Sequence, residues 1–135
     1  MAQTIVTTRR PAYQAYQILY IGFIVAPFLA GLDKFTNLLT NWDQYLAPLV
    51  ERLLPVSGQT FMLFVGIVEL AAAVLVATRP RIGAYVVAAW LLGIIVNLLL
   101  IPGYFDVALR DFGLALAALA FARLSEEFAE GPVRG

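Results

Sequence analysis

Four long apolar stretches, separated by short polar segments, dominate the pattern of this sequence. They cover about residues 12–34, 57–78, 82–101 and 105–124. A helix rises about 1.5 Å per residue, so about twenty apolar residues are needed to cross a hydrocarbon core of about 30 Å. The four stretches reach that length. The pattern therefore predicts an all-α integral membrane protein, a bundle of four transmembrane helices over residues 12–124.

Polar segments flank these stretches at both ends of the chain. Residues 1–11 end in Arg9-Arg10-Pro11 and predict a polar cytoplasmic lead, and residues 125–135 predict a frayed polar tail. A twin arginine before an apolar run is also typical of an export signal. This run is longer than the apolar part of a signal peptide and further spans follow it, so we expect it to be the first span.

The connection between the first two spans has a pattern of its own. Over residues 42–54 the apolar side chains recur at helical spacing, and the charged ones take the opposite face. This stretch is too short to span, so it predicts a short amphipathic helix in the membrane interface, with Trp42 and Tyr45 as interfacial anchors. A cap packed over the mouth of the bundle is an equally good interpretation, and the two are compatible.

Local signals indicate where the elements of this region begin and end. Asn41 is placed to cap the short helix, with Gln44 three residues later in the capping-box position. Pro48 is expected to split that helix into two pieces, and Pro55 to end it. Ser57 is placed to cap the second span.

Small residues recur every four positions in three of the spans and indicate helix–helix contacts. The stripes are Gly22-Ala26-Ala30, continued by Lys34; Glu69-Ala73-Ala77; and Ala89-Gly93-Asn97. Their polar members are expected to point into the bundle. Asp33 is offset by one residue, so we expect it to face the outer surface or the connecting helix.

Six polar residues are expected to meet in the outer half of the bundle as a candidate buried polar cluster. They are Asp33, Lys34, Glu69, Asn97, Arg110 and Asp111. A charge near mid-membrane costs at least about 2.5–3.5 kcal/mol, so Glu69 is expected to be protonated or paired with Lys34 or Arg110.

The same residues also have a purely structural interpretation. The first two can be helix ends in the interface, and Asn97 can be an ordinary interhelical hydrogen-bonding group. Arg110 can form an ion pair with Asp106, four residues earlier, or with Asp111, and such a pair can serve packing alone.

Composition supports a membrane protein and excludes several chemistries. The chain is 61% hydrophobic and 13% charged, against about 45–50% and about 25% in soluble domains. Nine basic residues balance nine acidic ones, so no net field attracts nucleic acid. With neither Cys nor His, we expect no metal site and no cofactor bound covalently or through those residues. A quinone or a lipid is the kind of cofactor that remains.

The distribution of Lys and Arg predicts the orientation. With the N-terminus inside, six basic residues lie on the inner side and three on the outer side. The inner ones are Arg9, Arg10, Arg79, Arg81, Arg123 and Arg134, and the outer ones are Lys34, Arg52 and Arg110. This bias predicts that both termini of the multi-pass protein lie in the cytoplasm. The membrane that we expect is a prokaryotic-type inner membrane.

Three short motifs resemble a known family. Gly31-Leu32-Asp33-Lys34-Phe35, Glu69 within the second span, and Arg110-Asp111-Phe112-Gly113 at the start of the fourth are similar to the DoxX-like family of small four-span membrane proteins. The resemblance covers about residues 12–124 and implies a four-helix bundle with both ends cytoplasmic. It also implies, for some members, a role as membrane subunit of a thiosulfate:quinone oxidoreductase. This chain has no Cys, which argues against thiol or polysulfide chemistry on the protein itself.

Two functional hypotheses follow. The first is a small, non-catalytic accessory subunit of a redox or energy-converting membrane complex, with the lipid bilayer and larger subunits as its partners. The second is a DoxX-like quinone- or sulfur-linked oxidoreductase subunit, in which Glu69 handles protons while Lys34 and Arg110 hold an anion or a quinone carbonyl. We favour the first, because a carboxylate can move protons but cannot carry electrons. A small transporter is less favoured, because no inverted repeat is evident.

Overall fold

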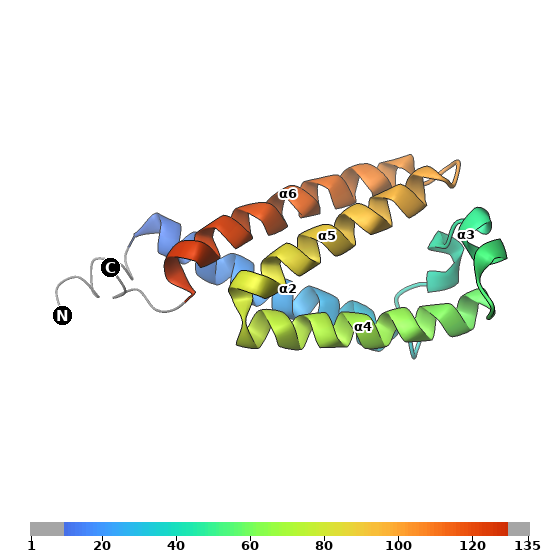
Figure 1. The fold of residues 1–135 in the computed structure, drawn as a ribbon, viewed down its shortest axis with the longest axis horizontal. Coiled ribbons are helices and arrows are strands. Elements are labelled where there is room, and N and C mark those ends of the chain that lie inside the picture. Colours follow the sequence, from blue (N-terminus) through green and yellow to red (C-terminus); the bar gives the residue numbers. More distant parts are fainter. Residues whose placement is uncertain (1–9, 130–135) are drawn as a thin grey trace.

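Four long helices form the body of the protein and pack as two pairs (Figure 1). The computed structural model describes residues 10–129. Helices α2 (Pro11–Asp33) and α4 (Gly58–Thr78) form one pair, and α5 (Pro80–Leu99) and α6 (Phe105–Phe128) form the other. Because α4 also contacts α5 and α2 also contacts α6, the four helices surround a common interior.

Three of these helices, α2, α4 and α5, are long and apolar enough to cross a membrane. Over the described range the structure has helices and no strand, which confirms the all-α prediction for that part of the chain. Helix α6 is long enough, but it carries charged residues near both ends. These are Asp106, Arg110 and Asp111 at one end and Arg123, Glu126 and Glu127 at the other.

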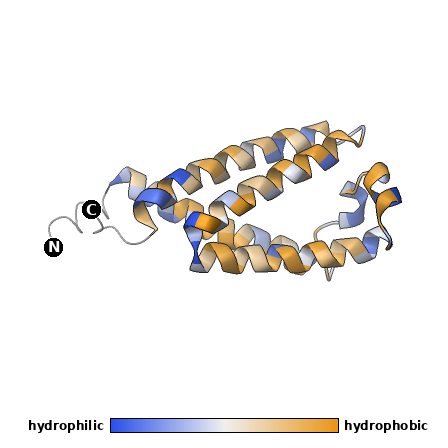
Figure 2. Ribbon diagram, viewed as in Figure 1, coloured by the Kyte–Doolittle hydropathy of each residue, from blue (hydrophilic) through white to orange (hydrophobic). Residues whose placement is uncertain are grey.

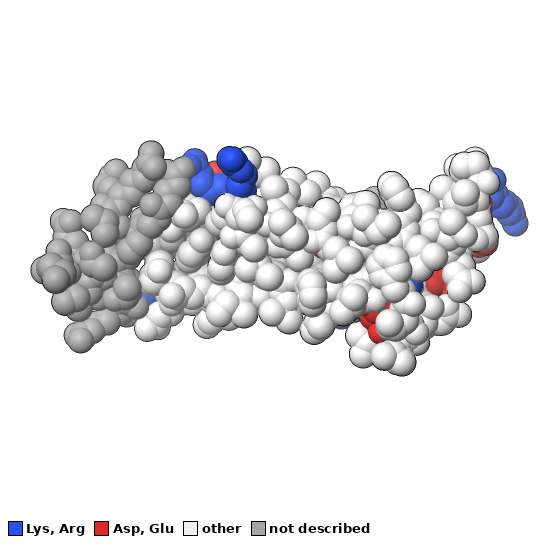
Figure 3. All heavy atoms as spheres, turned by 90° about the horizontal axis from the view of Figure 1, so that it is seen from below, with Lys and Arg blue, Asp and Glu red and all other residues white. Residues whose placement is uncertain are grey.

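Hydrophobic residues dominate the middle of the long helices, and polar residues lie toward the ends of the molecule (Figure 2). On the face seen in Figure 3, charged side chains gather toward the two ends, with a broad uncharged region between them. This distribution is the one that a hydrocarbon layer favours, since charges outside it keep their hydration.

Helix α5 begins two residues earlier than the apolar run indicated. It starts at Pro80, so Arg79 alone separates it from α4. Proline suits the first position of a helix because its fixed φ is helical and its missing N–H has no partner there in any case.

The prediction of a frayed tail from residue 125 was wrong for the residues that the structure describes. Helix α6 continues to Phe128, and both Ser125 and Phe128 are buried. The ring of Phe128 lies 5.2 Å from that of Tyr13 and 5.9 Å from that of Tyr16, measured between centroids, and this packing favours the last turn. Residues 1–9 and 130–135, which include the predicted lead and most of the tail, lie outside the described residues.

The connection between α2 and α4 is not one amphipathic helix over residues 42–54. It contains a 3₁₀ turn, η1 (Trp42–Tyr45), and a short helix, α3 (Pro48–Leu53). Pro48 is the first residue of α3, so the predicted split is confirmed.

The two predicted caps had different outcomes. The side chain of Asn41 makes no cap hydrogen bond, and Gln44 Nε2 donates to Thr40 Oγ1 at 2.7 Å, so the predicted capping box was wrong. The Ser57 cap is confirmed, because Ser57 Oγ accepts a hydrogen bond from the Thr60 N–H at 3.2 Å.

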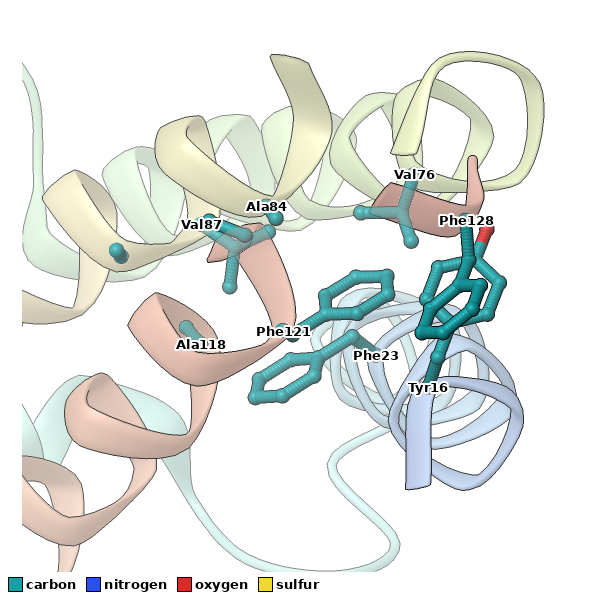
Figure 4. Close-up of a cluster of buried hydrophobic side chains, with 10 residues drawn as sticks. Tyr16, Phe23, Val76, Ala84, Val87, Ala118, Phe121 and Phe128 are labelled. Carbon is teal, nitrogen blue, oxygen red and sulfur yellow. The ribbon is translucent and has the colours of Figure 1, made fainter. Parts of the chain in front are cut away.

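An aromatic cluster fills the interior at the end where α2 begins and α6 ends (Figure 4). The rings of Phe23 and Phe121 stack with centroids 5.7 Å apart, and Tyr16 and Phe128 pack beside them. Phe121 is completely buried. Aromatic rings of this size each bury about 150–250 Å² and dominate local packing, so they close the interior at this end.

A close helix contact joins α2 to α4 through two glycines. A Cβ built on Gly31 would lie 2.7 Å from the carbonyl oxygen of Gly66, and one built on Gly66 would lie 2.8 Å from that of Gly31. The predicted stripes placed this kind of contact at Gly22 and Gly93, which was wrong, because an added Cβ at either meets no atom within 4 Å. A period of four residues does not by itself reveal which side of a helix meets its neighbour.

Candidate functional site

A cavity of about 360 Å³ lies between the two helix pairs. Its lining comes from all four long helices and from the connection that contains η1. Most of the lining is apolar, and Phe23 belongs both to it and to the aromatic cluster, which therefore forms its floor. Ligand pockets commonly enclose about 300–1,000 Å³ with apolar walls and a few polar groups, so this cavity suits a small molecule or a head group.

A buried ion pair joins the wall formed by α2 and α4. Lys34 Nζ lies 2.5 Å from Glu69 Oε1, and the two side chains are 6% and 11% exposed. The contact between Lys34 Nζ and Glu69 Oε1 is an ion pair. Among the described residues, Glu69 Oε1 has no hydrogen-bond partner with regular angles. The sequence predicted Lys34 or Arg110 as the partner of Glu69, and in the structure the partner is Lys34. The close approach of Gly31 and Gly66 permits this ion pair, because it brings the backbones of α2 and α4 together next to the side chains of Lys34 and Glu69.

The indole of Trp42 covers the ammonium group of this pair. Lys34 Nζ lies 3.8 Å from the centroid of the Trp42 ring, which is a cation–π contact. The ring and the carboxylate of Glu69 together compensate for the hydration that a buried ammonium loses.

Asp33 does not line the cavity, but it organises the connection that covers it. Its carboxylate accepts hydrogen bonds from Trp42 Nε1 at 2.8 Å, from Thr36 Oγ1 at 2.9 Å, and from the backbone N–H groups of Leu38 and Leu39 at 3.0 Å. The sequence predicted that Asp33 faces the outer surface or the connecting helix, and the connection is what it contacts. The carboxylate fixes Trp42 in place over Lys34, so Asp33 is a positioning residue.

Replacing Asp33 with asparagine should loosen the connection. An amide offers one acceptor where the carboxylate offers two, so part of this network is lost, at a cost of about 1–3 kcal/mol. We expect hydrogen exchange at Leu38 and Leu39 to accelerate about tenfold or more, measured by mass spectrometry in nanodiscs. Asp43→Asn, in the same connection, is the control and should leave that exchange unchanged. Equal exchange in both variants would contradict the role given to Asp33.

Asn97 on α5 forms two hydrogen bonds with the connection between α2 and α4. Its Oδ1 accepts a hydrogen bond from the Ala47 N–H at 2.9 Å, and its Nδ2 donates to the Tyr45 carbonyl oxygen at 2.5 Å. Leu46 and Ala47 are buried. The sequence predicted that Asn97 faces a neighbouring element, and that element is the connection rather than another span.

The connection therefore packs as a cap over one end of the cavity. Trp42 and Tyr45 line the cavity, and the Tyr45 ring lies 4.9 Å from that of Tyr104 on the other helix pair. Both residues are half-buried, and their assignment as interfacial anchors stays a prediction beside these contacts. The periodic pattern showed one apolar side and could not show whether lipid or protein covers it.

Arg110 is not buried, which corrects its place in the candidate cluster. Its side chain is 68% exposed, and Arg110 Nε and Nη2 donate to Asp111 Oδ1 at 3.2 and 3.1 Å. Asp111 is buried, with a side chain that is 7% exposed. Among the described residues, the ion-pair partner of Arg110 is thus Asp111 and not Asp106. Both Arg110 and Asp111 line the cavity from α6, whereas Lys34 and Glu69 line it from the α2–α4 pair.

The charges that line the cavity balance. One wall contributes Lys34 with Glu69 and the other contributes Arg110 with Asp111. A charged ligand would leave an uncompensated charge in an apolar environment, at a cost of several kcal/mol. The cavity therefore suits a neutral molecule that is mostly apolar and has hydrogen-bonding groups.

Trp90 lines the cavity as well, and reasoning from the sequence missed it. The sequence spacing could have indicated that Trp90 faces the same interior as Asn97. Trp90 precedes Asn97 by seven residues and so lies on the same face of α5, two turns away. The described residues bring together no group of three His, Cys, Asp or Glu side chains placed to hold a metal ion.

No protein-family model, no curated protein and no solved structure matches this chain. The similarity to the DoxX-like family therefore stays a prediction. The fold and site define a helical protein with three membrane-compatible helices and a capped cavity that carries balanced charges.

Proposed function

We propose that this protein is a four-span membrane protein that binds a small neutral amphipathic molecule, such as a quinone head group, in its capped cavity. The observation that carries the proposal is the buried Lys34–Glu69 pair in a mostly apolar cavity of about 360 Å³. Neutral carbonyl groups can accept hydrogen bonds from such a site without upsetting its charge balance.

The proposal includes α6 as the fourth span. Residues 112–122 in its middle carry no charge, and its charged residues lie toward its two ends. Helix α6 also packs along α5, and the two run in opposite directions after a short turn. If α5 crosses the membrane, α6 returns through it. The excess of basic residues at the Arg79 end supports a cytoplasmic location of both termini, in an inner membrane of prokaryotic type.

Single cysteines test this topology directly, because the natural sequence contains none. We expect Arg79→Cys and Glu127→Cys to react with a membrane-impermeant maleimide only from the cytoplasmic side. Pro102→Cys should react only from the opposite side. Reaction of Pro102→Cys and Glu127→Cys from the same side would show that α6 does not span.

The chain binds the ligand without carrying electrons. With neither Cys nor His, it offers no Cys ligand for an iron–sulfur cluster and no His or Cys ligand for a haem. We therefore propose that it serves as a non-catalytic subunit beside larger redox subunits, which keeps the accessory role that the sequence favoured and gives it a binding site. A quinone is preferred to an anion because of the balanced charges.

Ligand binding has a built-in reporter. The chain has two tryptophans, Trp42 and Trp90, and both line the cavity. We expect a short-chain benzoquinone to quench their fluorescence saturably in lipid nanodiscs, and a non-absorbing carbonyl analogue to restore it by competition. Quenching that rises without saturation, as for a tryptophan-containing single-span peptide in the same nanodiscs, would contradict the proposal.

A further inference from the structure

One polar group of the cavity has no partner. The indole Nε1 of Trp90 is buried and has no hydrogen-bond acceptor among residues 10–129. An indole N–H is a donor and cannot act as an acceptor, and leaving such a donor unpaired costs about 1–3 kcal/mol. Buried donors are rarely left unpaired in native proteins, so this one points to an acceptor that the described chain does not supply.

The other nitrogen-bearing side chains that line the cavity already have partners. Trp42 Nε1 donates to Asp33, and Asn97 Nδ2 donates to the Tyr45 carbonyl oxygen. Lys34 and Arg110 are engaged with Glu69 and Asp111 on their own walls. Trp90 therefore differs from Trp42, which is the same residue type in the same cavity with its N–H occupied.

The surroundings of Trp90 define the acceptor further. Trp90 lies on α5, three positions after Val87 and one and four positions before Leu91 and Ile94, and these three apolar residues line the cavity with it. A neutral oxygen is favoured here, because the two ion pairs leave no net charge to balance an anion. A carbonyl oxygen on a flat apolar ring has these properties.

We infer that Trp90 is the hydrogen-bond donor that recognises a carbonyl oxygen of the ligand, and that the site prefers an oxidised quinone to its quinol. This inference rests on the proposed function. The preference follows because a donor-only indole pairs best with a carbonyl, whereas the hydroxyl of a quinol is a weaker acceptor and brings a donor of its own that needs a partner.

Indole N–H resonances of the wild-type protein report the hydrogen bond directly. With ¹⁵N-labelled tryptophan in nanodiscs, the two tryptophans give two indole signals, which Trp90→Phe assigns. We expect a short-chain benzoquinone to move the Trp90 proton signal downfield. The Trp42 N–H, already bonded to Asp33 at 2.8 Å, should move less.

Binding constants measured by equilibrium dialysis complete the test. Trp90→Phe should weaken binding of the benzoquinone about three- to tenfold and abolish its preference over the quinol. A hydrocarbon analogue without carbonyls, with the same ring and tail, is the control and should bind wild type and variant alike.

The outcomes separate the two proposals. Saturable binding with an unmoved Trp90 signal, or with equal affinity in Trp90→Phe, overturns the role of Trp90 and leaves the proposed function standing; a water molecule would then be the acceptor. Absence of saturable binding to the wild-type protein overturns the proposed function and this inference with it.

Discussion

Replacing Lys34 with methionine should destabilise the protein by about 3–5 kcal/mol, the largest effect that we expect from a single substitution. The change keeps an unbranched side chain of similar length but leaves the Glu69 carboxylate buried without the cation 2.5 Å away. It also removes the charge beneath the Trp42 ring. Thermal and denaturant unfolding in a mild detergent would measure the loss of stability.

A second substitution shows whether the unpaired charge is the cause. Lys34→Met combined with Glu69→Leu removes both charges and should recover most of the lost stability, because an apolar pair of similar volume often replaces a buried ion pair without loss. Arg52→Met deletes an exposed cation on α3 and is the control, with an expected change within about 0.5 kcal/mol. A double variant as unstable as Lys34→Met alone would refute this account of the pair.

Adding a methyl group at Gly31 or Gly66 should destabilise the protein by about 1–3 kcal/mol, the range expected for overpacking. The new Cβ would lie 2.7–2.8 Å from a backbone carbonyl oxygen of the facing helix, which cannot turn aside as a side chain can. In Gly66→Ala it would also lie 3.0 Å from Lys34 Cβ, so we expect displacement of the ion pair and weaker ligand binding.

Two other glycines provide matched controls on the same kind of helix. An added Cβ at Gly22 or Gly93 meets nothing within 4 Å, so alanine there should be neutral or should stabilise by about 0.4–1 kcal/mol. Melting temperatures of the four alanine variants test this contrast. Similar values at all four positions would show that α2 and α4 are farther apart than described.

The helices could be predicted from the sequence because apolar runs of this length have few alternatives. Their ends agree with the prediction to within two residues except at α6, where the packing of Phe128 on Tyr13 and Tyr16 adds a last turn. That packing joins the start of α2 to the end of α6, which are far apart in the sequence, so no local pattern contains it.

The candidate site was predictable only in part. The burial of Glu69 required a cation, and Lys34 was one of two candidates. The prediction that Arg110 is buried was wrong. Its long side chain reaches the carboxylate of the neighbouring Asp111 while it remains mostly exposed to the surroundings of the protein. Asp33 acts on groups three to nine residues later, a loop geometry that propensities do not encode.

The link between α4 and α5 is a single residue, Arg79. The two helix pairs are therefore joined covalently at this end, and the stacked rings of Phe23 and Phe121 connect α2 to α6. At the far end, the pairs meet through the hydrogen bonds of Asn97 to the connection and through the Tyr45–Tyr104 ring contact. If the cavity binds a molecule, we expect these outer contacts, rather than the linked end, to break when that molecule enters or leaves.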